Sequence, residues 1–117
     1  MTKLLATWNR PGEVALKGAW AAPAGSSLRD RIVAGLATAE LDPALLLIGL
    51  GALPNSDGDV ELDAAIMEGR GLQAGAVCAV RSICPVIEVA ARVMDQTPHV
   101  LLAGDGARRF AIETGSL

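Results

Sequence analysis

Few residues of this chain have the type and spacing that catalysis requires. Glu61 and Asp63 come closest, because they lie two residues apart in an alternating segment and would share one face of a strand. Neighbouring carboxylates can serve as general acid and base. Solvation of a polar face, or hydrogen bonding to a neighbouring loop, explains the same pair without chemistry. We therefore predict a non-catalytic role for both.

A nucleophile needs a base within hydrogen-bond reach, and the chain offers little to build such a pair. Its single histidine, His99, directly precedes the apolar run Val100–Leu102. This position favours a structural role at the start of a buried strand over a catalytic one. No Gly-x-Ser-x-Gly elbow is present. The serines lie in turn or helix-cap contexts that account for them: Ser26, Ser27, Ser56, Ser82 and Ser116.

Two glycine-rich stretches could in principle hold phosphate. Gly49 and Gly51 begin a dinucleotide-type pattern, but Pro54 stands where the third glycine belongs, and the segment enters a hairpin where the motif requires a helix. The Gly104–Gly106 stretch precedes a predicted helix, whose N-terminus could attract an anion. Asp105 would repel that anion and is expected to be the N-cap of the helix.

Composition narrows the function classes further. The 117 residues are 51% apolar, and their formal net charge is −3 with no clustered basic residues, which argues against nucleic acid and anionic membranes as partners. The longest apolar run, Ala44–Ala52, is too short to span a bilayer, and no signal peptide is recognised. Cys78 and Cys84 lack metal-ligand spacing, so we predict no metal or cofactor and a reducing, cytoplasmic location.

Hydrophobic periodicity predicts an α/β unit over residues 1–117, in the order strand, helix, helix, strand, hairpin, helix, strand, helix. Ser27 is expected to cap the second helix, and Pro85 to be the first residue of the third. The expected elements are a strand at 4–8, helices at 13–22 and 28–41, a strand at 45–48, a hairpin of 60–67 with 76–80, a helix following Pro85, a strand at 99–103 and a last helix after residue 104.

Trp8 ends the first predicted strand beside a Pro-Gly turn. A tryptophan here can fill a core or line a binding pocket, and the residues alone do not separate the two interpretations. The last predicted helix closes only just before the end of the chain. A sheet with this many unpaired edges normally needs another chain to cover them, which we take as a sign of incompleteness.

Two long collinear motifs resemble the family of glycosylasparaginases and isoaspartyl peptidases/plant-type asparaginases. Residues 97–107 read T-P-H-V-L-L-A-G-D-G-A, similar to that family's T-P-H-V-L-L-V-G-E-G-A. Residues 53–69 resemble its L-P-N-x-x-G-x-V-E-L-D-A-x-I-M-D-G. Thr7-Trp8 resembles the T-W near the start of the glycosylasparaginase branch. The similarity extends over nearly the whole chain, from about Leu5 to Gly115.

The resemblance implies an N-terminal-nucleophile hydrolase with an αββα sandwich, made as a precursor that cleaves itself before a threonine. In such enzymes the new N-terminal Thr of the β chain attacks the side-chain amide of an asparagine-like substrate, and its own α-amine acts as base. An oxyanion hole of the β chain stabilises the intermediate. None of the threonines here follows His-Asp or His-Gly as the family's nucleophile does: Thr2, Thr7, Thr38, Thr97 and Thr114.

The resemblance therefore makes this chain an α subunit, half of the sandwich, completed by a β chain that carries the N-terminal Thr in an (αβ)2 assembly. It assigns one site residue, Trp8, which would line the substrate pocket. Leu47 replaces the asparagine of the asparaginase branch, whose cation-binding loop lies just upstream, so no sodium site is predicted. Cys84 replaces a usual Asn or His before Pro85. These departures, with Trp8, favour the glycosylasparaginase branch.

Two function classes remain from the sequence. The first is the α subunit of an amidohydrolase that acts on N4-(β-N-acetylglucosaminyl)-L-asparagine or β-aspartyl compounds. The second is a non-catalytic binding or scaffold domain that retains only the first half of the fold. The presence or absence of a β chain beginning with Thr distinguishes them.

Overall fold

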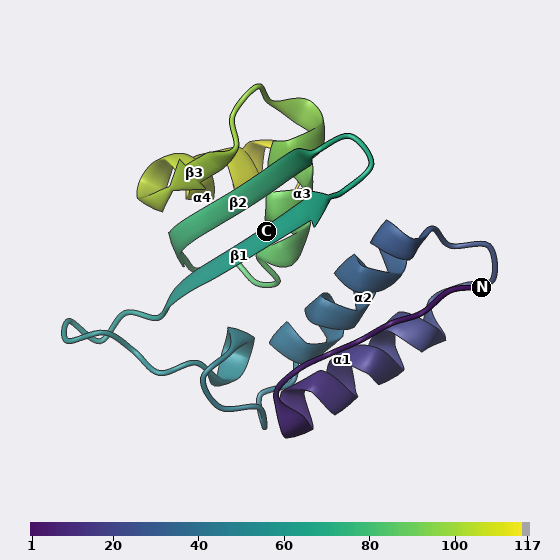
Figure 1. The fold of residues 1–117 in the computed structure, drawn as a ribbon. Helices are drawn as coiled ribbons and strands as arrows, with labels where there is room; N and C mark the ends of the chain where they lie inside the picture. The colour runs from purple at the N-terminus through teal and green to yellow at the C-terminus, as the bar shows by residue number, and fades with distance from the viewer. Residues whose placement is uncertain (116–117) are drawn as a thin grey trace.

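The computed structural model describes residues 1–115 (Figure 1). The predicted α/β class is confirmed: the described residues form four α-helices and a small mixed sheet. In chain order the elements are α1 (Asn9–Ala21), α2 (Leu28–Glu40), the 3-10 turn η1 (Gly49–Gly51), β1 (Glu61–Glu68), β2 (Gln73–Arg81), α3 (Ile87–Gln96), β3 (Leu101–Ala103) and α4 (Gly104–Glu113).

The sheet has the strand order β1-β2-β3. Strands β1 and β2 form the predicted antiparallel hairpin, with Glu68 opposite Gln73 next to the turn. Strand β3 lies parallel to β2, and the connection between them contains α3, as a parallel crossover requires. The register shifts between Leu62 and Ala64, which marks a bulge close to Asp63.

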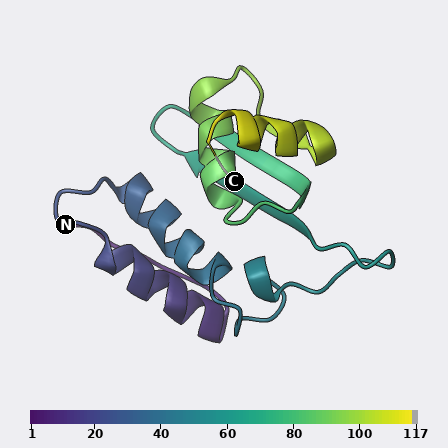
Figure 2. The same cartoon turned by 180° about the vertical axis from the view of Figure 1, so that it is seen from behind.

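Helices α3 and α4 both cover the same face of the sheet, as the front and back views show (Figures 1 and 2). The core lies between them and β2, where aliphatic side chains and alanine permit close packing. In this core Val80, Val89, Val93, Ala107 and Ala111 are fully buried, and Phe110 packs at its edge.

The opposite face of the sheet carries no helix from the part of the chain that the structure describes. Alternation along the strands places Ala65, Ala76 and Leu101 in one row across this face, with Cys78 beside Ala103 in the next. Leu101 retains 53% of its surface exposed. Small apolar side chains on a flat face suit packing against another sheet at about 10 Å.

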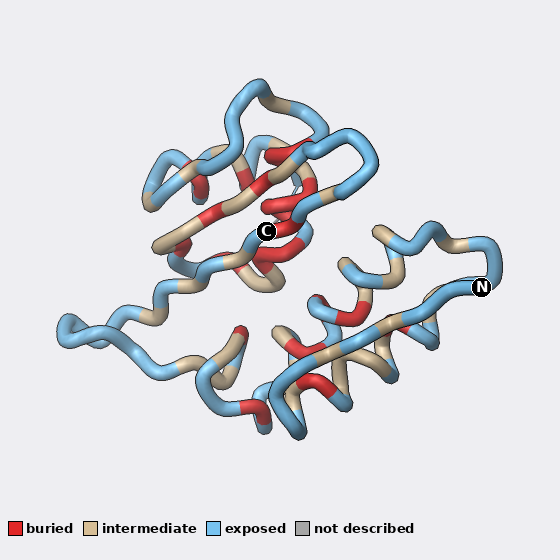
Figure 3. Tube along the Cα trace, viewed as in Figure 1, coloured by how far each residue is buried: buried red, intermediate tan, exposed pale blue. Residues whose placement is uncertain are grey.

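Helices α1 and α2 form an antiparallel pair beside the sheet layer (Figure 1). Glycines allow their backbones to approach closely. A Cβ at Gly35 would overlap the carbonyl oxygen of Ala15 and come within 3.0 Å of the Ala19 Cβ, and a Cβ at Gly18 would lie 2.7 Å from the Thr38 Cβ. Figure 3 shows that only short stretches of this pair are buried, and Ala37 of α2 belongs to the core beside α3.

Two predicted strands are not present. Residues 4–8 form an extended segment without regular secondary structure, and residues 45–48 form turns in which Leu47 has a φ of 78°. The physical reason is the same for both, since a strand needs a hydrogen-bonded neighbour and the sheet of the described chain lies elsewhere. In the second segment only Leu45 is buried, so the continuous apolar run does not indicate a strand buried on both faces.

Helices α1 and α3 begin at other residues than predicted, whereas the predicted cap of α2 is present. Helix α1 begins at Asn9, because the predicted Pro-Gly turn is its first helical turn, where proline is tolerated. Ser27 caps α2 as predicted, its hydroxyl accepting a hydrogen bond from the N–H of Asp30 at 3.0 Å. Helix α3 begins at Ile87, so Pro85 precedes the helix and is not its first residue.

Gly35→Ala is expected to lower the free energy of unfolding by about 1–3 kcal/mol, because the added methyl group overpacks the contact between α1 and α2. Gly106→Ala is the matched control, since a Cβ at this helical glycine meets open space, and alanine should raise helix stability by up to about 1 kcal/mol. Urea unfolding of the two variants checks the opposite signs. Equal effects would show that the close approach at Gly35 does not limit the fold.

Candidate functional site

Trp8 occupies the junction between the extended N-terminal segment and α1. It is the N-cap residue of α1 and has a φ of 69°, which residues other than glycine rarely adopt. Its exposed surface is 55%. Its carbonyl oxygen accepts a hydrogen bond from the N–H of Gly12 at 2.7 Å. The sequence left open whether Trp8 fills the core or lines a binding pocket. Its exposed surface contradicts the first interpretation, because a core residue would be buried.

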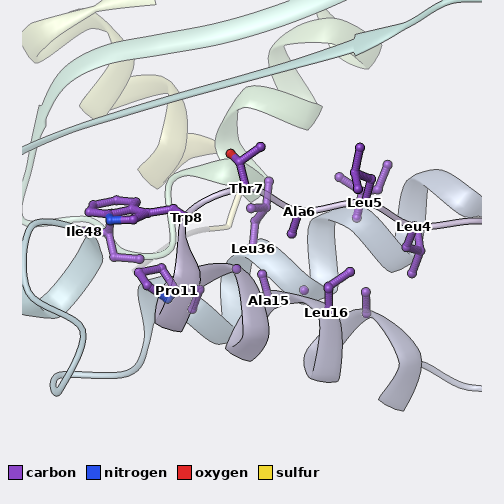
Figure 4. A pocket seen from close by; sticks show the side chains of 15 residues that line it. Leu4, Leu5, Ala6, Thr7, Trp8, Pro11, Ala15, Leu16, Leu36 and Ile48 are labelled. Carbon is purple, nitrogen blue, oxygen red and sulfur yellow. The ribbon is translucent and has the colours of Figure 1, made fainter.

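An apolar cleft of about 380 Å³ lies beneath the extended segment. Figure 4 shows Trp8 and Ile48 together at one end of this cleft, with Leu4, Leu5 and Leu16 toward the other end. Its floor comes from α1 and α2, which contribute Ala15, Leu16, Ile32 and Leu36. The large apolar side chains along one stripe of α2 are half-exposed: Leu28 is 52%, Ile32 39% and Leu36 38% accessible.

The C-terminal end of α2 is joined to the start of α3 by Glu40. The two carboxylate oxygens of Glu40 accept hydrogen bonds from the N–H groups of Val86, at 2.7 Å, and Ile87, at 2.9 Å. Helix α3 has no side-chain cap of its own, so Glu40 provides one from another helix. Burial raises the pKa of Glu40, and the charge of Glu88 raises it further, while the two backbone hydrogen bonds act in the opposite direction.

The N-terminal end of α2 is joined to the other end of α3 by Arg29. Its guanidinium pairs with Asp95, donates to the carbonyl oxygen of Ala91 at 3.4 Å and lies 3.8 Å from Glu68 at the end of β1. The hydrogen bond to Asp95 is the main cause of a raised pKa for Arg29. No local pattern in the sequence identifies Arg29 or Glu40, because their partners are about 45 to 65 residues away in the chain.

The carboxylate pair Glu61 and Asp63 lies on the exposed side of β1, at a second cleft of about 430 Å³ between β1 and the end of α2. Asp63 accepts a hydrogen bond from the N–H of Ala79 at 2.8 Å. Ala79 has a φ of 53°, so Asp63 holds the bulged backbone of β2 in a left-handed conformation. The predicted polar role of Asp63 is confirmed, and its partner is the neighbouring strand.

The remaining sequence candidates do not gather at one site. His99 is exposed on the turn before β3, which begins only at Leu101, so the prediction that it starts a buried strand is wrong. Asp105 is not the N-cap of α4: Ala103 is, and Asp105 lies in the first turn, 3.8 Å from Arg81. The reason is that the helix follows β3 directly, so Asp105 is already inside it.

Both cysteines are free and half-buried, and the Sγ of Cys84 lies 3.6 Å from the carbonyl oxygen of Glu40. Burial, with a smaller contribution from Glu40, raises the pKa of Cys84 to about 11, which keeps this thiol protonated and unreactive at neutral pH. Within residues 1–115 no three His, Cys, Asp or Glu side chains lie close enough to hold a metal ion. No helix of this described part is long and apolar enough to cross a membrane.

The geometry thus offers an apolar cleft with one half-exposed tryptophan. The family model described as asparaginase matches residues 9–116. This chain belongs to that family. The resemblance found in its motifs is therefore confirmed.

The curated relatives of this asparaginase-family chain include both branches of the family. The rat isoaspartyl peptidase/L-asparaginase is 45% identical over 92 residues, which cover 79% of this chain and 27% of the relative. The N(4)-(beta-N-acetylglucosaminyl)-L-asparaginase of Elizabethkingia miricola is 40% identical over 113 residues, 96% of this chain and 33% of the relative. The chain spans about a quarter to a third of the length of these relatives.

Two predictions for this asparaginase-family chain concern the role of Trp8 and the branch of the family. Trp8 lies one residue before the range that the family model matches, so its role in substrate binding stays a prediction. The preference for the glycosylasparaginase branch also stays a prediction, because relatives from both branches match at similar identity.

The raised pKa of Glu40 predicts how stability changes with pH. The folded state binds this proton more tightly than the unfolded state, so the stabilising contribution is complete below pH 4.5, the ordinary value, and is lost as the pH rises through the raised pKa. Urea unfolding across this pH range should therefore show wild-type protein gaining stability relative to Glu40→Gln as the pH falls. A constant difference between the two proteins would contradict the burial of the charge.

Proposed function

We propose that this chain is the α subunit of an amidohydrolase that cleaves the side-chain amide of asparagine-like substrates, with the nucleophile supplied by the N-terminal Thr of a β chain. Membership in the asparaginase family supports the reaction class. The substrates are β-aspartyl compounds, with N4-(β-N-acetylglucosaminyl)-L-asparagine preferred, since Thr7-Trp8 resembles the glycosylasparaginase branch.

The observation that carries this proposal is the way Trp8 is presented. A 55% exposed indole at the mouth of an apolar cleft is not needed to fill the core, yet it is held at a left-handed backbone position by the start of α1. Such a residue presents a flat apolar surface with one hydrogen-bond donor, the kind of wall that orients a small amphipathic substrate.

Several unpaired surfaces support a β chain as the partner of this subunit. The helix-free face of the sheet, the exposed stripe of α2 and the extended segment at 4–8 are all apolar and uncovered in the described residues. A second sheet on the first of these faces would complete an αββα sandwich, and a strand beside residues 4–8 would turn that segment into part of a sheet. Two such αβ units form the proposed (αβ)2 assembly.

In the proposed reaction, the α-amine of the β-chain Thr takes the proton of its hydroxyl group, and the hydroxyl oxygen attacks the side-chain carbonyl carbon of the substrate. The amide C–N bond then breaks, and the leaving nitrogen takes the proton. Water hydrolyses the resulting β-aspartyl ester and releases aspartate. In this scheme the residues of the α subunit bind and orient the substrate, and Trp8 forms one wall of its site.

Intact-mass analysis of the natively purified protein tests the partnership. A second chain that begins with Thr is expected, together with release of aspartate from β-aspartyl amides. The leaving group is identified by comparing glycosylated asparagine, β-aspartyl dipeptides and asparagine as substrates. A lone chain with no such partner and no hydrolysis would instead indicate the non-catalytic binding domain.

Trp8→Ala is expected to raise the KM of the assembled enzyme by about tenfold or more, since losing the contact area of a large apolar side chain costs about 1.5–3 kcal/mol. Self-cleavage of the precursor should stay largely unchanged, because Trp8 takes no part in that cleavage in this proposal. Trp20→Ala is the matched control, since Trp20 is 53% exposed at the far end of the same helix. Steady-state kinetics decide: an unchanged KM removes Trp8 from the site.

A further inference from the structure

Glu40 stands at the meeting point of three segments. Its carboxylate binds the first N–H groups of α3, as described above, and its carbonyl oxygen lies 3.6 Å from the Cys84 thiol on the turn before α3. Its backbone also supports η1, because a Cβ at Gly49 would overlap the carbonyl oxygen and Cα of Glu40. Glu40 therefore holds together the end of α2, the start of α3 and the loop at 49–51.

The same segments form the wall on which Trp8 rests. Leu36 and Ala39 of the last turns of α2 line the cleft together with Trp8, and so does Ile48, the residue immediately before Gly49. Figure 4 shows Trp8 beside Ile48, with Leu36 further along the cleft. Any movement of the α2 terminus relative to the 48–51 loop changes the surface that Trp8 contacts.

We infer that Glu40 is a positioning residue for Trp8, which it acts on through the last turn of α2 and Ile48. Its role in substrate binding rests on the proposed function, whereas its effect on the position of Trp8 does not. When ionised, the carboxylate accepts from both Val86 and Ile87. On protonation one oxygen carries the proton and becomes a weaker acceptor, so one of the two N–H groups is bound less tightly and the junction changes.

Several other groups set the charge around Glu40. Glu88 on α3 faces it and disfavours its ionised form, and the Cys84 thiol lies 4.0 Å from its Oε2. Glu61 and Asp63 of β1 line the same cleft as Glu40. The pair formed by Arg29 sits eleven residues earlier on α2, about 16 Å away at 1.5 Å per residue, and belongs to the opposite end of the helix.

Fluorescence of the protein in a Trp20→Phe background tests the inference, because Trp8 is then the only tryptophan of this chain. The emission maximum and acrylamide quenching of Trp8 are expected to change with pH, with a midpoint above 4.5, the ordinary pKa of the carboxyl group. Glu40→Gln, which keeps one acceptor oxygen, should abolish this transition. Arg29→Gln is the matched control: it removes the other attachment of α2 and should leave the transition in place.

Two results would overturn the inference: a pH transition of Trp8 that persists in Glu40→Gln, or an Arg29→Gln variant that shifts Trp8 as much. The absence of any pH transition in the fluorescence of Trp8 when Glu40 is present would also refute the inference. That measurement needs no variant at position 40. In the assembled enzyme, Glu40→Gln should raise KM for a β-aspartyl amide by about threefold to tenfold with little change in kcat. Absence of hydrolysis in every protein would refute the proposed function and leave the fluorescence result to decide the inference.

Discussion

The attachment of α2 to α3 is the constraint on which the rest of this structure depends. Helix α3 packs on the sheet and contributes more of the buried core than any other element of the described chain, whereas α2 packs against α1 and lines the cleft. The two helices meet through charged side chains at both ends of α2. Glu40 accepts from the N–H groups at the start of α3, and Arg29 donates to a carbonyl oxygen near its end.

This arrangement matches each charge to the helix terminus that favours it. The N-terminus of a helix carries partial positive charge and exposes unpaired N–H groups, and the C-terminus is the reverse. Asp95, in the last turn of α3, would be unfavourable alone, but Arg29 neutralises it. The contact therefore specifies both the direction and the register of α2 on α3, which an aliphatic contact alone specifies less sharply.

The apolar surfaces of the described chain divide into a buried set and an exposed set, and the proposed substrate cleft belongs to the exposed set. One face of the sheet is closed by α3 and α4, while the other face and the stripe of α2 remain accessible. In the proposed αβ assembly, these exposed faces are where the β chain packs. Trp8 lies at the border between the packed helix pair and this open side (Figure 4).

The sequence by itself determined the elements whose partners are local. The Ser27 cap, the hairpin of β1 and β2 and the apolar stripe of α3 follow from spacing within a few residues, and the two collinear motifs determined the family. Only the tertiary structure decided that residues 4–8 and 45–48 lack strand partners, that Trp8 is exposed, and that Glu40 caps a distant helix. These depend on groups up to about 50 residues apart, and local periodicity carries no information about contacts at that separation.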